Sequence, residues 1–352
     1  MAYSTISKPN LHFNTVLYTG NGANARGITG VGFQPDLVWI RNRNTSTNHL
    51  LFDSVRGTGS IRSDGNSGEN AAQSDELTGY ASDGFTLSTG GDVNGNTKLI
   101  CAWCWKIPDT NNASASGSGT NKHIATTGKK NVAAGQAILT YTGDGQGGDL
   151  QHGLGNYVTH PTGWWAIFHK RNASETTDWA SFHTYGYNAT DFLTLNNNDA
   201  ASDSSTLWND TNPSDTEFQI ITANTVNQDG NTYVSYHFHD VEGYSRMGSY
   251  IGNGNADGPF VPCGFQPAFV IVKKVNGSHN WIMFDNKREP VNDGTGSFLE
   301  ADTTDVEDTD PCIDLVSQGF KVRDTADRYN GDDNQYIFMA WASLPSKYNN
   351  AR

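Results

Sequence analysis

Two aspartates follow apolar runs at positions where a carboxylate could do chemistry. Asp53 has Arg56 three residues later, and Asp285 and Arg288 repeat the pattern. Acid–base cleavage of a glycosidic bond needs two converging carboxylates, and each motif supplies only one. The alternative is a turn at the end of a strand, in which the aspartate binds backbone amides and the arginine pairs nearby. We expect the turn, and the sequence assigns no catalytic residue.

Histidines are concentrated in the middle third of the chain, where His237 and His239 are two residues apart. On a strand they would share one face, and imidazoles so placed can hold a metal ion. Two ligands do not define a site, so neither a metal nor a cofactor is expected.

A second group of potential ligands is acidic. Its members are Asp302, Asp305, Glu307, Asp308, Asp310 and Asp314. Calcium prefers such oxygen ligands, but the twelve-residue EF-hand pattern is missing, and a run of like charges usually faces water. We expect a solvated loop.

Four cysteines are too few for a disulfide scaffold in 352 residues. Cys101 and Cys104 lie within an apolar run that is typical of a strand, where residues three apart point to opposite faces. Their side chains should therefore diverge. Cys263 and Cys312 are expected to be free, buried thiols.

Aromatic residues give the middle of the chain its candidate contact surface. They are Trp164, Tyr185, Tyr187 and Trp208. Exposed aromatics can stack on sugars or anchor a partner, whereas buried ones fill a core. Both alternatives stay open. The sequence has no nucleophile elbow, phosphate loop or zinc-hydrolase motif.

The elements that would position these residues are strands. Hydrophobic residues make up only 36%, and there are 38 glycines with much Asn, Asp, Ser and Thr. Short apolar runs between such turn-forming residues indicate an all-β chain. The net charge of −14 argues against binding to nucleic acid. No stretch predicts a signal peptide or membrane insertion.

Three stretches of the chain share one order of motifs. Tyr-Thr-Gly-Asn-Gly at 18–22 recurs as Tyr-Thr-Gly-Asp-Gly at 141–145 and as Tyr-Ile-Gly-Asn-Gly at 250–254. Each is followed by an apolar strand that ends in basic residues, a second strand, and a polar turn before a last strand that is apolar on both faces. Those last strands should be central and covered on both sides.

The repetition predicts three tandem β-sandwiches of jelly-roll type, related by internal repetition. The predicted parts are an arm at 1–13, repeats at 14–107, 136–243 and 246–344, a linker at 108–135 and a tail at 345–352.

Several of these motifs together resemble a known family. They occupy residues 1–6, 18–22, 32–43, 52–57, 83–87 and 102–106. The sequence is similar to a repeated β-domain of uncharacterised function found in structural proteins of tailed phages, especially of marine and freshwater bacteria. The similarity is strongest over 1–107, good in the third repeat and weak in the second, where His183 replaces the aspartate.

The resemblance implies a non-enzymatic, exterior structural protein of a phage virion, made in the host cytoplasm. A capsid decoration, a head appendage and a compact tail adhesin all fit, because the chain lacks the long shaft of a fibre. The expected partners are other virion proteins, and possible ones are a host glycan or further copies of the chain. The alternatives are a carbohydrate-binding host-recognition module and, more remotely, a glycan-degrading enzyme.

The first thirteen residues precede the repeats and mix polar residues with spaced apolar ones. Those apolar residues are Tyr3, Ile6, Leu11 and Phe13. An extended segment of this kind can fill pockets on a neighbour or add a strand to its sheet. We expect a docking arm that lies outside any domain core; the alternative is an edge strand folded back on the first domain.

Overall fold

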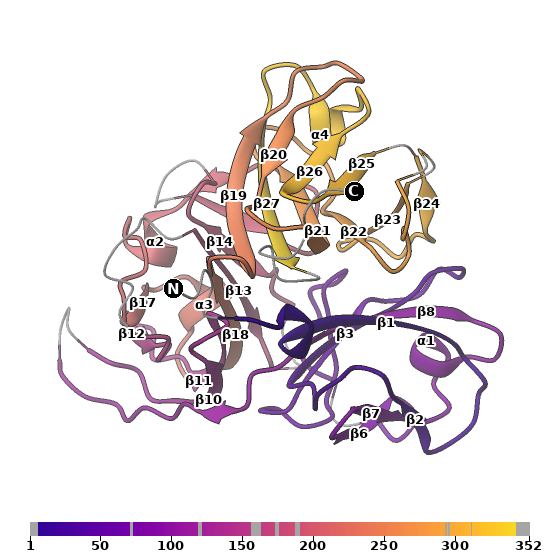
Figure 1. The fold of residues 1–352 in the computed structure, drawn as a ribbon. Coiled ribbons are helices and arrows are strands. Elements are labelled where there is room, and N and C mark those ends of the chain that lie inside the picture. Colours follow the sequence, from indigo (N-terminus) through magenta and orange to yellow (C-terminus); the bar gives the residue numbers. More distant parts are fainter. Residues whose placement is uncertain are drawn as a thin grey trace.

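The computed structural model describes residues 6–70, 73–118, 122–155, 163–172, 176–186, 191–292, 294, 296–310 and 312–342. Strands dominate, the helices are single turns, and every ladder between named strands is antiparallel. The prediction of an all-β chain is therefore confirmed. Figure 1 shows three lobes, each built on one of the three larger sheets.

The first sheet has five strands in the order β1-β8-β3-β4-β5. Their bounds are β1 Phe13–Thr19, β8 Leu99–Trp105, β3 Leu37–Asn42, β4 Leu50–Asp53 and β5 Ile61–Arg62. A small sheet, β2-β7-β6, packs on one face. Its strands are β2 Arg26–Ile28, β7 Gly84–Leu87 and β6 Leu77–Ala81, and the nearby turns are η1 Pro9–Leu11 and α1 Gly91–Asn94.

The middle sheet has eight strands in the order β16-β15-β14-β13-β18-β11-β10-β9. Their bounds are β16 Ser202–Asp203, β15 Asp191–Thr194, β14 Ala180–His183, β13 Trp164–Lys170, β18 Thr232–His239, β11 Gln136–Thr142, β10 Thr126–Asn131 and β9 Asp109–Thr110. Its small sheet pairs β12 Gly148–Gln151 with β17 Glu217–Ile220, beside α2 Ser205–Trp208 and α3 Asn224–Asn227. Since β9 and β10 extend the middle sheet, the prediction of a linker at 108–135 is wrong for these residues.

The third sheet has six strands in the order β19-β27-β21-β22-β23-β24. Their bounds are β19 Ser245–Ile251, β27 Gln335–Ala342, β21 Pro267–Lys274, β22 Ile282–Asp285, β23 Ser297–Glu300 and β24 Asp308–Thr309. Its small sheet, β20-β26-β25, consists of β20 Phe260–Pro262, β26 Gly319–Val322 and β25 Ile313–Val316, and α4 spans Asp327–Asn330.

One order of strands occurs in all three larger sheets: β1-β8-β3-β4, β11-β18-β13-β14 and β19-β27-β21-β22. The register agrees as well, because Leu37, Trp165 and Phe269 lie opposite Trp105, Phe238 and Trp341. In each sheet the last long strand (β8, β18 or β27) has a neighbour on both sides and is buried on both faces. The prediction that these strands are central is confirmed.

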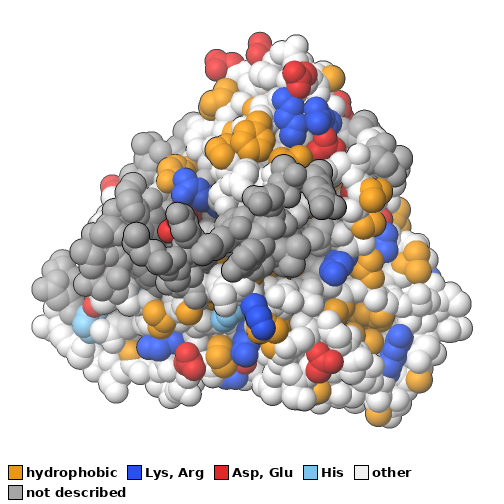
Figure 2. Space-filling view, viewed as in Figure 1, with side chains coloured by type: hydrophobic (Ala, Val, Ile, Leu, Met, Phe, Trp, Pro, Cys, Tyr) orange, Lys and Arg blue, Asp and Glu red, His pale blue; other side chains and the backbone are white. Residues whose placement is uncertain are grey.

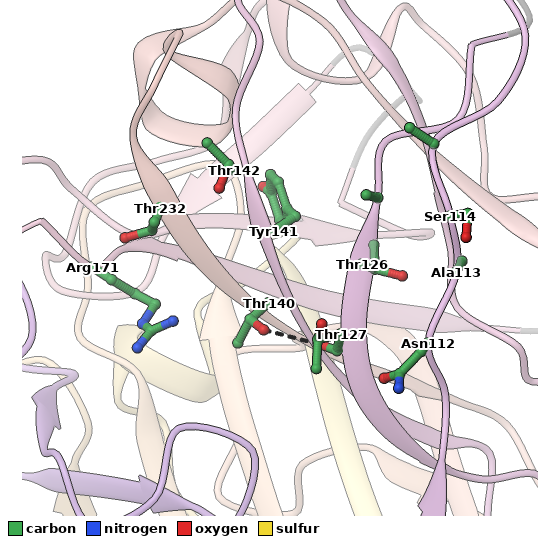
Figure 3. A pocket seen from close by; sticks show the side chains of 12 residues that line it. Asn112, Ala113, Ser114, Thr126, Thr127, Thr140, Tyr141, Thr142, Arg171 and Thr232 are labelled. Atoms are coloured by element: carbon green, nitrogen blue, oxygen red, sulfur yellow. Dashed lines mark hydrogen bonds between the residues drawn. The ribbon is translucent and has the colours of Figure 1, made fainter.

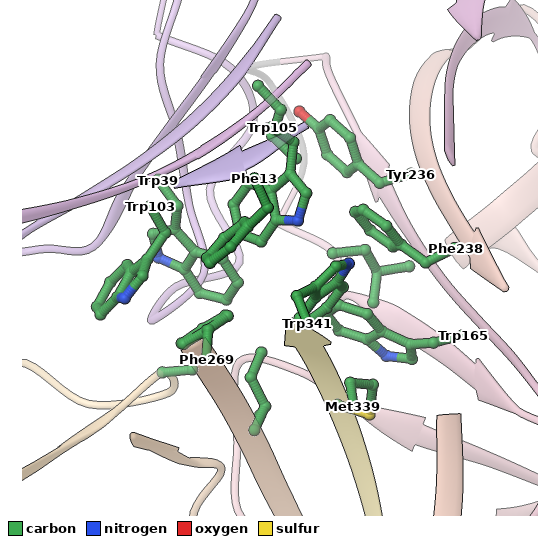
Figure 4. Packing of buried hydrophobic residues seen from close by; sticks show 14 of the residues in the cluster. Phe13, Trp39, Trp103, Trp105, Trp165, Tyr236, Phe238, Phe269, Met339 and Trp341 are labelled. Carbon is green, nitrogen blue, oxygen red and sulfur yellow. The ribbon is translucent and has the colours of Figure 1, made fainter. Parts of the chain in front are cut away.

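The faces that the small sheets leave free meet in one aromatic core (Figure 4). Trp105, Phe238 and Trp341, one from each larger sheet, form a triangle with ring centroids 5.3 to 6.0 Å apart. Phe13 stacks on Phe269 at 5.7 Å within the same cluster. The three lobes are therefore not independent bodies, because one core contains buried residues of all three.

A buried ion-pair network joins the first sheet to the middle sheet. Arg56 Nε lies 2.5 Å from Asp53 Oδ2, and both side chains are fully buried. Tyr236 donates its hydroxyl to the same carboxylate oxygen at 2.7 Å. Glu69 then bridges Arg56 at 3.1 Å and Arg171 of the middle sheet at 2.5 Å. Each charge in this network has an opposite charge beside it, and such pairing offsets the cost of removing charges from water.

The same network recurs between the third sheet and the first. Arg288 Nε lies 2.5 Å from Asp285 Oδ2, and the Trp103 indole of the first sheet donates to that oxygen at 3.1 Å. Glu307 binds Arg43 Nε at 2.5 Å and lies 3.7 Å from Arg288. The turn interpretation holds for both aspartates, because Asp53 and Asp285 also accept backbone amide bonds from their own turns.

The interface between the middle and third sheets lacks this network among the described residues. His183 stands at the end of β14, and its ring lies 3.4 Å from the carbonyl oxygen of Phe338. The backbone amide of Ala201 donates to the carbonyl of Val275 at 2.9 Å. The other two interfaces contain equivalent backbone bonds, from the amide of Glu69 to the carbonyl of Arg171 and from the amide of Glu307 to the carbonyl of Arg43. Two interfaces thus contain ion pairs, whereas the third is joined by hydrogen bonds to backbone carbonyls, such as those from Lys273 to Asp199 and from Trp281 to Thr194.

Replacing Asp285 with Asn should lower the free energy of unfolding by about 3–5 kcal/mol, because it leaves the Arg288 guanidinium buried without its main counter-charge. Urea unfolding followed by tryptophan fluorescence measures the loss. The matched control is Asp257→Asn, which removes a carboxylate 2.7 Å from Lys321 on a side chain that is 86% exposed. Equal unfolding midpoints for the two variants would contradict a role for Asp285 in joining the sheets.

Candidate functional site

A polar groove of about 620 Å³ runs along the middle sheet beside β10 and β11 (Figure 3). The described residues that line it are Asn112, Ala113, Ser114, Ala115, Ala125, Thr126, Thr127, Thr140, Tyr141, Thr142, Arg171 and Thr232. Hydroxyl groups predominate, with one amide and one guanidinium, and none of these residues is acidic.

Strand pairing explains how the groove forms. Thr127 lies opposite Thr140 in the β10–β11 ladder, and the Thr140 hydroxyl donates to the Thr127 carbonyl at 3.0 Å. Alternation along β11 sends Leu139 and Tyr141 into the sandwich core, so Thr140 and Thr142 lie on the opposite face. Ala113 exchanges backbone bonds of 2.9 and 3.0 Å with Thr126, which holds the preceding segment beside β10 as a wall.

The chemistry of the groove suits a neutral, hydroxylated ligand. Hydroxyl groups both donate and accept hydrogen bonds, as do the ring hydroxyls of a sugar. Arg171 is already engaged by Glu69, so its charge is largely balanced. The groove could not be predicted from the sequence, because its threonines come from three segments that are separated along the chain.

The aromatic residues predicted from the sequence do not form this surface. Trp164 is 5% exposed and Trp208 is fully buried, and both belong to the core between the middle sheet and its small sheet. The prediction that these residues contact a sugar or a partner is therefore wrong for Trp164 and Trp208, which are core residues. Tyr185 is partly exposed and packs against the central core, whereas Tyr187 lies outside the described residues.

The middle lobe carries five buried imidazoles. They belong to His152, His169, His183, His237 and His239. Burial lowers the pKa of His169 and His183 to about 3, that of His152 and His239 to about 4, and that of His237 well below its usual value. His237 and His239 share one face, where they contact Phe168 and Trp164. They act as neutral core residues.

The cysteines lie as expected. Cys101 belongs to the central core and Cys104 to the core of the first sandwich, so the prediction that their side chains diverge is confirmed. Cys263 and Cys312 are free and buried, as are the other two. Burial raises the pKa of all four thiols, which makes them poor nucleophiles.

The expectation of a solvated loop holds for part of the acidic segment between 302 and 314, since Asp305 and Asp308 are exposed, but not for Asp302 and Glu307. Asp302 is 8% exposed and accepts the Trp281 amide at 2.9 Å. Glu307 joins the Arg43 network, while Asp310 and Asp314 pair with arginines of their own lobe. The pairing of Glu307 with Arg43, which is distant in sequence, is the part that local composition could not reveal.

The N-terminal arm contributes to the fold directly. Ile6 and Phe13 are 2% and 1% exposed and belong to the central core, so the expectation that the arm lies outside any core is wrong for these two. Only Phe13 of the arm enters the edge strand β1; the described residues 6–12 contain the turn η1 and no strand, so the edge-strand alternative is not shown for them. Leu11 is 38% exposed, and Tyr3 lies outside the described residues.

The buried histidines predict loss of stability in acid. An unfolded imidazole has a pKa near 6.5, whereas the buried imidazoles have lower pKa values. Below pH 6.5 the unfolded chain therefore binds more protons than the folded chain, which lowers the free energy of unfolding. Burial raises the pKa of Asp64 and Asp240 to about 6 and of Asp302 to about 7, and these groups offset part of the effect. The net expectation is a fall of about 1–3 kcal/mol per pH unit between pH 6 and 5. Urea unfolding at pH 8, 6 and 5 measures it; constant stability would contradict the burial of neutral imidazoles.

Comparison with known proteins places the whole fold in one family. None of the described helices is long and apolar enough to cross a membrane. A search of curated proteins found no match. A family model described as a domain of unknown function, DUF7483, matches residues 8–345, which include all three larger sheets and the strand that opens with Phe13. The chain therefore belongs to the DUF7483 family.

Proposed function

We propose that this protein is a non-enzymatic, exterior structural component of a phage particle. The shared central core carries the proposal, because it makes one chain into a rigid three-lobed body. Such a body can present several surfaces at fixed angles, which an attachment or decoration protein needs. The motifs that resemble phage structural domains support the same role.

We further infer that the three lobes are copies of one sandwich. The common strand order, the common register and the repeated Asp–Arg motif support this reading. In the middle copy His183 ends the strand that corresponds to those ending in Asp53 and Asp285, so the middle copy lacks the aspartate of the ionic network.

Glycan cleavage is poorly supported by the two aspartates that first suggested it. Asp53 and Asp285 are each fully buried, ion-paired with an arginine and hydrogen-bonded by an aromatic side chain. A general acid must reach its substrate, and these carboxylates have no access to it.

The visible surface fits many small contacts rather than one large apolar one. In Figure 2 the exposed hydrophobic side chains form small separate groups among polar ones, and charges of both signs are dispersed. Exposed apolar residues such as Leu17, Ile251 and Phe260 come from different elements. This pattern suits a component that contacts several neighbours in a particle.

Mass spectrometry of density-purified phage particles from a host that produces this protein should detect the chain after protease and nuclease washing. Cryo-electron microscopy of the same particles should then show a three-lobed density on the exterior, on the capsid or the tail. A chain found only in the unassembled lysate would contradict the proposal.

A second function, binding of a neutral host glycan, is favoured by the hydroxyl-lined groove. Ala115→Trp should fill the groove and reduce glycan-array signals at least tenfold. The matched control is Ala133→Trp, at an exposed alanine in the turn of the same β10–β11 hairpin but outside the groove. Array binding that both variants keep, or the absence of any signal from the unmodified chain, would exclude the groove as a glycan site.

A further inference from the structure

Three potential metal ligands meet at the edge of the small sheet formed by β12 and β17. They are His123, Asp149 and Glu217, whose ligand atoms all lie within 4.8 Å of one another. His123 Nε2 is 2.8 Å from a Glu217 carboxylate oxygen, and these two side chains are 25% and 29% exposed. Asp149 lies deeper, at 9% exposed. Solvent therefore reaches a group whose innermost member is a buried carboxylate.

Backbone hydrogen bonds fix all three positions. Asp149 donates its amide to the Lys122 carbonyl at 2.7 Å, and Ile124 donates to the Asp149 carbonyl at 3.0 Å, so His123 is held beside Asp149. On its other side the His123 amide donates to the Ser116 carbonyl at 2.8 Å. Glu217 is diagonal to Asp149 in the β12–β17 ladder.

Strand alternation places the carboxylates on the outer face of this small sheet. Leu150 and Phe218, the residues between them in the ladder, both point into the sandwich core. The small sheets of the other two lobes contain the same kind of pair, Ile28 with Phe85 and Val261 with Phe320.

The residues that flank those pairs differ from the middle lobe. The positions corresponding to Asp149 and Glu217 are Gly27 and Gly84 in the first lobe and Phe260 and Gly319 in the third. Neither of the other two small sheets has a carboxylate there. The cluster is a feature of the middle lobe, and so is the segment that brings His123 to it.

The electrostatics favour a cation. Asp149 and Glu217 hold two carboxylates within 4.8 Å of each other, and Asp149 is buried, so the two repel each other in a partly desolvated place. A single imidazole cannot balance two carboxylates. A divalent ion would balance both negative charges at once.

We propose that His123, Asp149 and Glu217 bind one divalent transition-metal ion, with Zn²⁺ as the best match. Zinc accepts imidazole nitrogen and carboxylate oxygen at about 2.0–2.2 Å, so tetrahedral ligand atoms lie roughly 3.4 Å apart. The observed ligand atoms, all within 4.8 Å of one another, lie near that spacing. Water completes the fourth position on the exposed side.

Ser116 supplies the support that a histidine ligand requires. Its hydroxyl oxygen lies 2.9 Å from His123 Nδ1. When Nε2 binds the metal, Nδ1 carries the proton and donates it to this oxygen, which orients the ring. The ion would then hold His123 and its backbone partner Ser116 against the small sheet, next to the residues 112–115 that form the wall of the groove.

Isothermal titration calorimetry of the full-length, chelator-treated chain with ZnCl₂ tests the proposal. One ion per chain should bind, and Zn²⁺ should raise the melting temperature. His123→Gln should weaken binding at least 100-fold, and Asp149→Asn serves as a second variant if the first does not fold. With Co²⁺, the visible absorption of a tetrahedral site should appear in the unmodified chain and vanish in the variant.

The matched control is His279→Gln in the third lobe. His279 Nε2 lies 2.9 Å from Asp327, so it has a carboxylate partner but belongs to no three-ligand group among the described residues. This variant should bind Zn²⁺ like the unmodified chain. Absence of saturable binding, equal loss in both variants, or preference for Ca²⁺ over Zn²⁺ would each overturn the assignment.

Discussion

The contact of three aromatic rings, Trp105, Phe238 and Trp341, is the interaction on which the arrangement of the sheets depends. Each ring comes from the last long strand of a different sheet, and all three centroids lie within 6.0 Å of one another. Aromatic side chains bury large apolar areas, so exposing this face of a sheet to water would cost several kcal/mol of folding free energy. The sheets therefore close on one another, each covering the face that its own small sheet leaves bare.

This closure places strict limits on charge. A carboxylate that enters such a core must bring its counter-ion with it, and Asp53 and Asp285 do so through the arginine three residues later. Directional bonds from Tyr236 and Trp103 then connect neighbouring sheets. At the interface between the middle and third sheets, His183 takes the place of the aspartate, and burial lowers its pKa so that the imidazole stays neutral.

Local patterns in the sequence were sufficient for the all-β class and for the long apolar strands. Alternation separated Cys101 from Cys104, and the doubly apolar final strands indicated burial on both faces. What covers the second face could not be read locally, because it is the equivalent face of a strand more than a hundred residues away. For the same reason Ile6 and Phe13 suggested a free arm, although their pocket is built by the third sheet as well as the first. The groove and its wall depend on β9 and β10, whose polar composition is typical of a linker.

Closure between the first and the third sheets has a consequence for synthesis. Trp103 binds Asp285 and Arg43 binds Glu307. In each pair the second residue is synthesised more than 180 residues after the first. Until β27 is complete, the nascent chain keeps Trp105 and Phe238 uncovered on two finished sheets. Exposed aromatic faces of this kind associate with other chains. The nascent chain therefore passes through an aggregation-prone stage until Trp341 has emerged and packed, and a stop codon anywhere ahead of Trp341 would make that stage permanent.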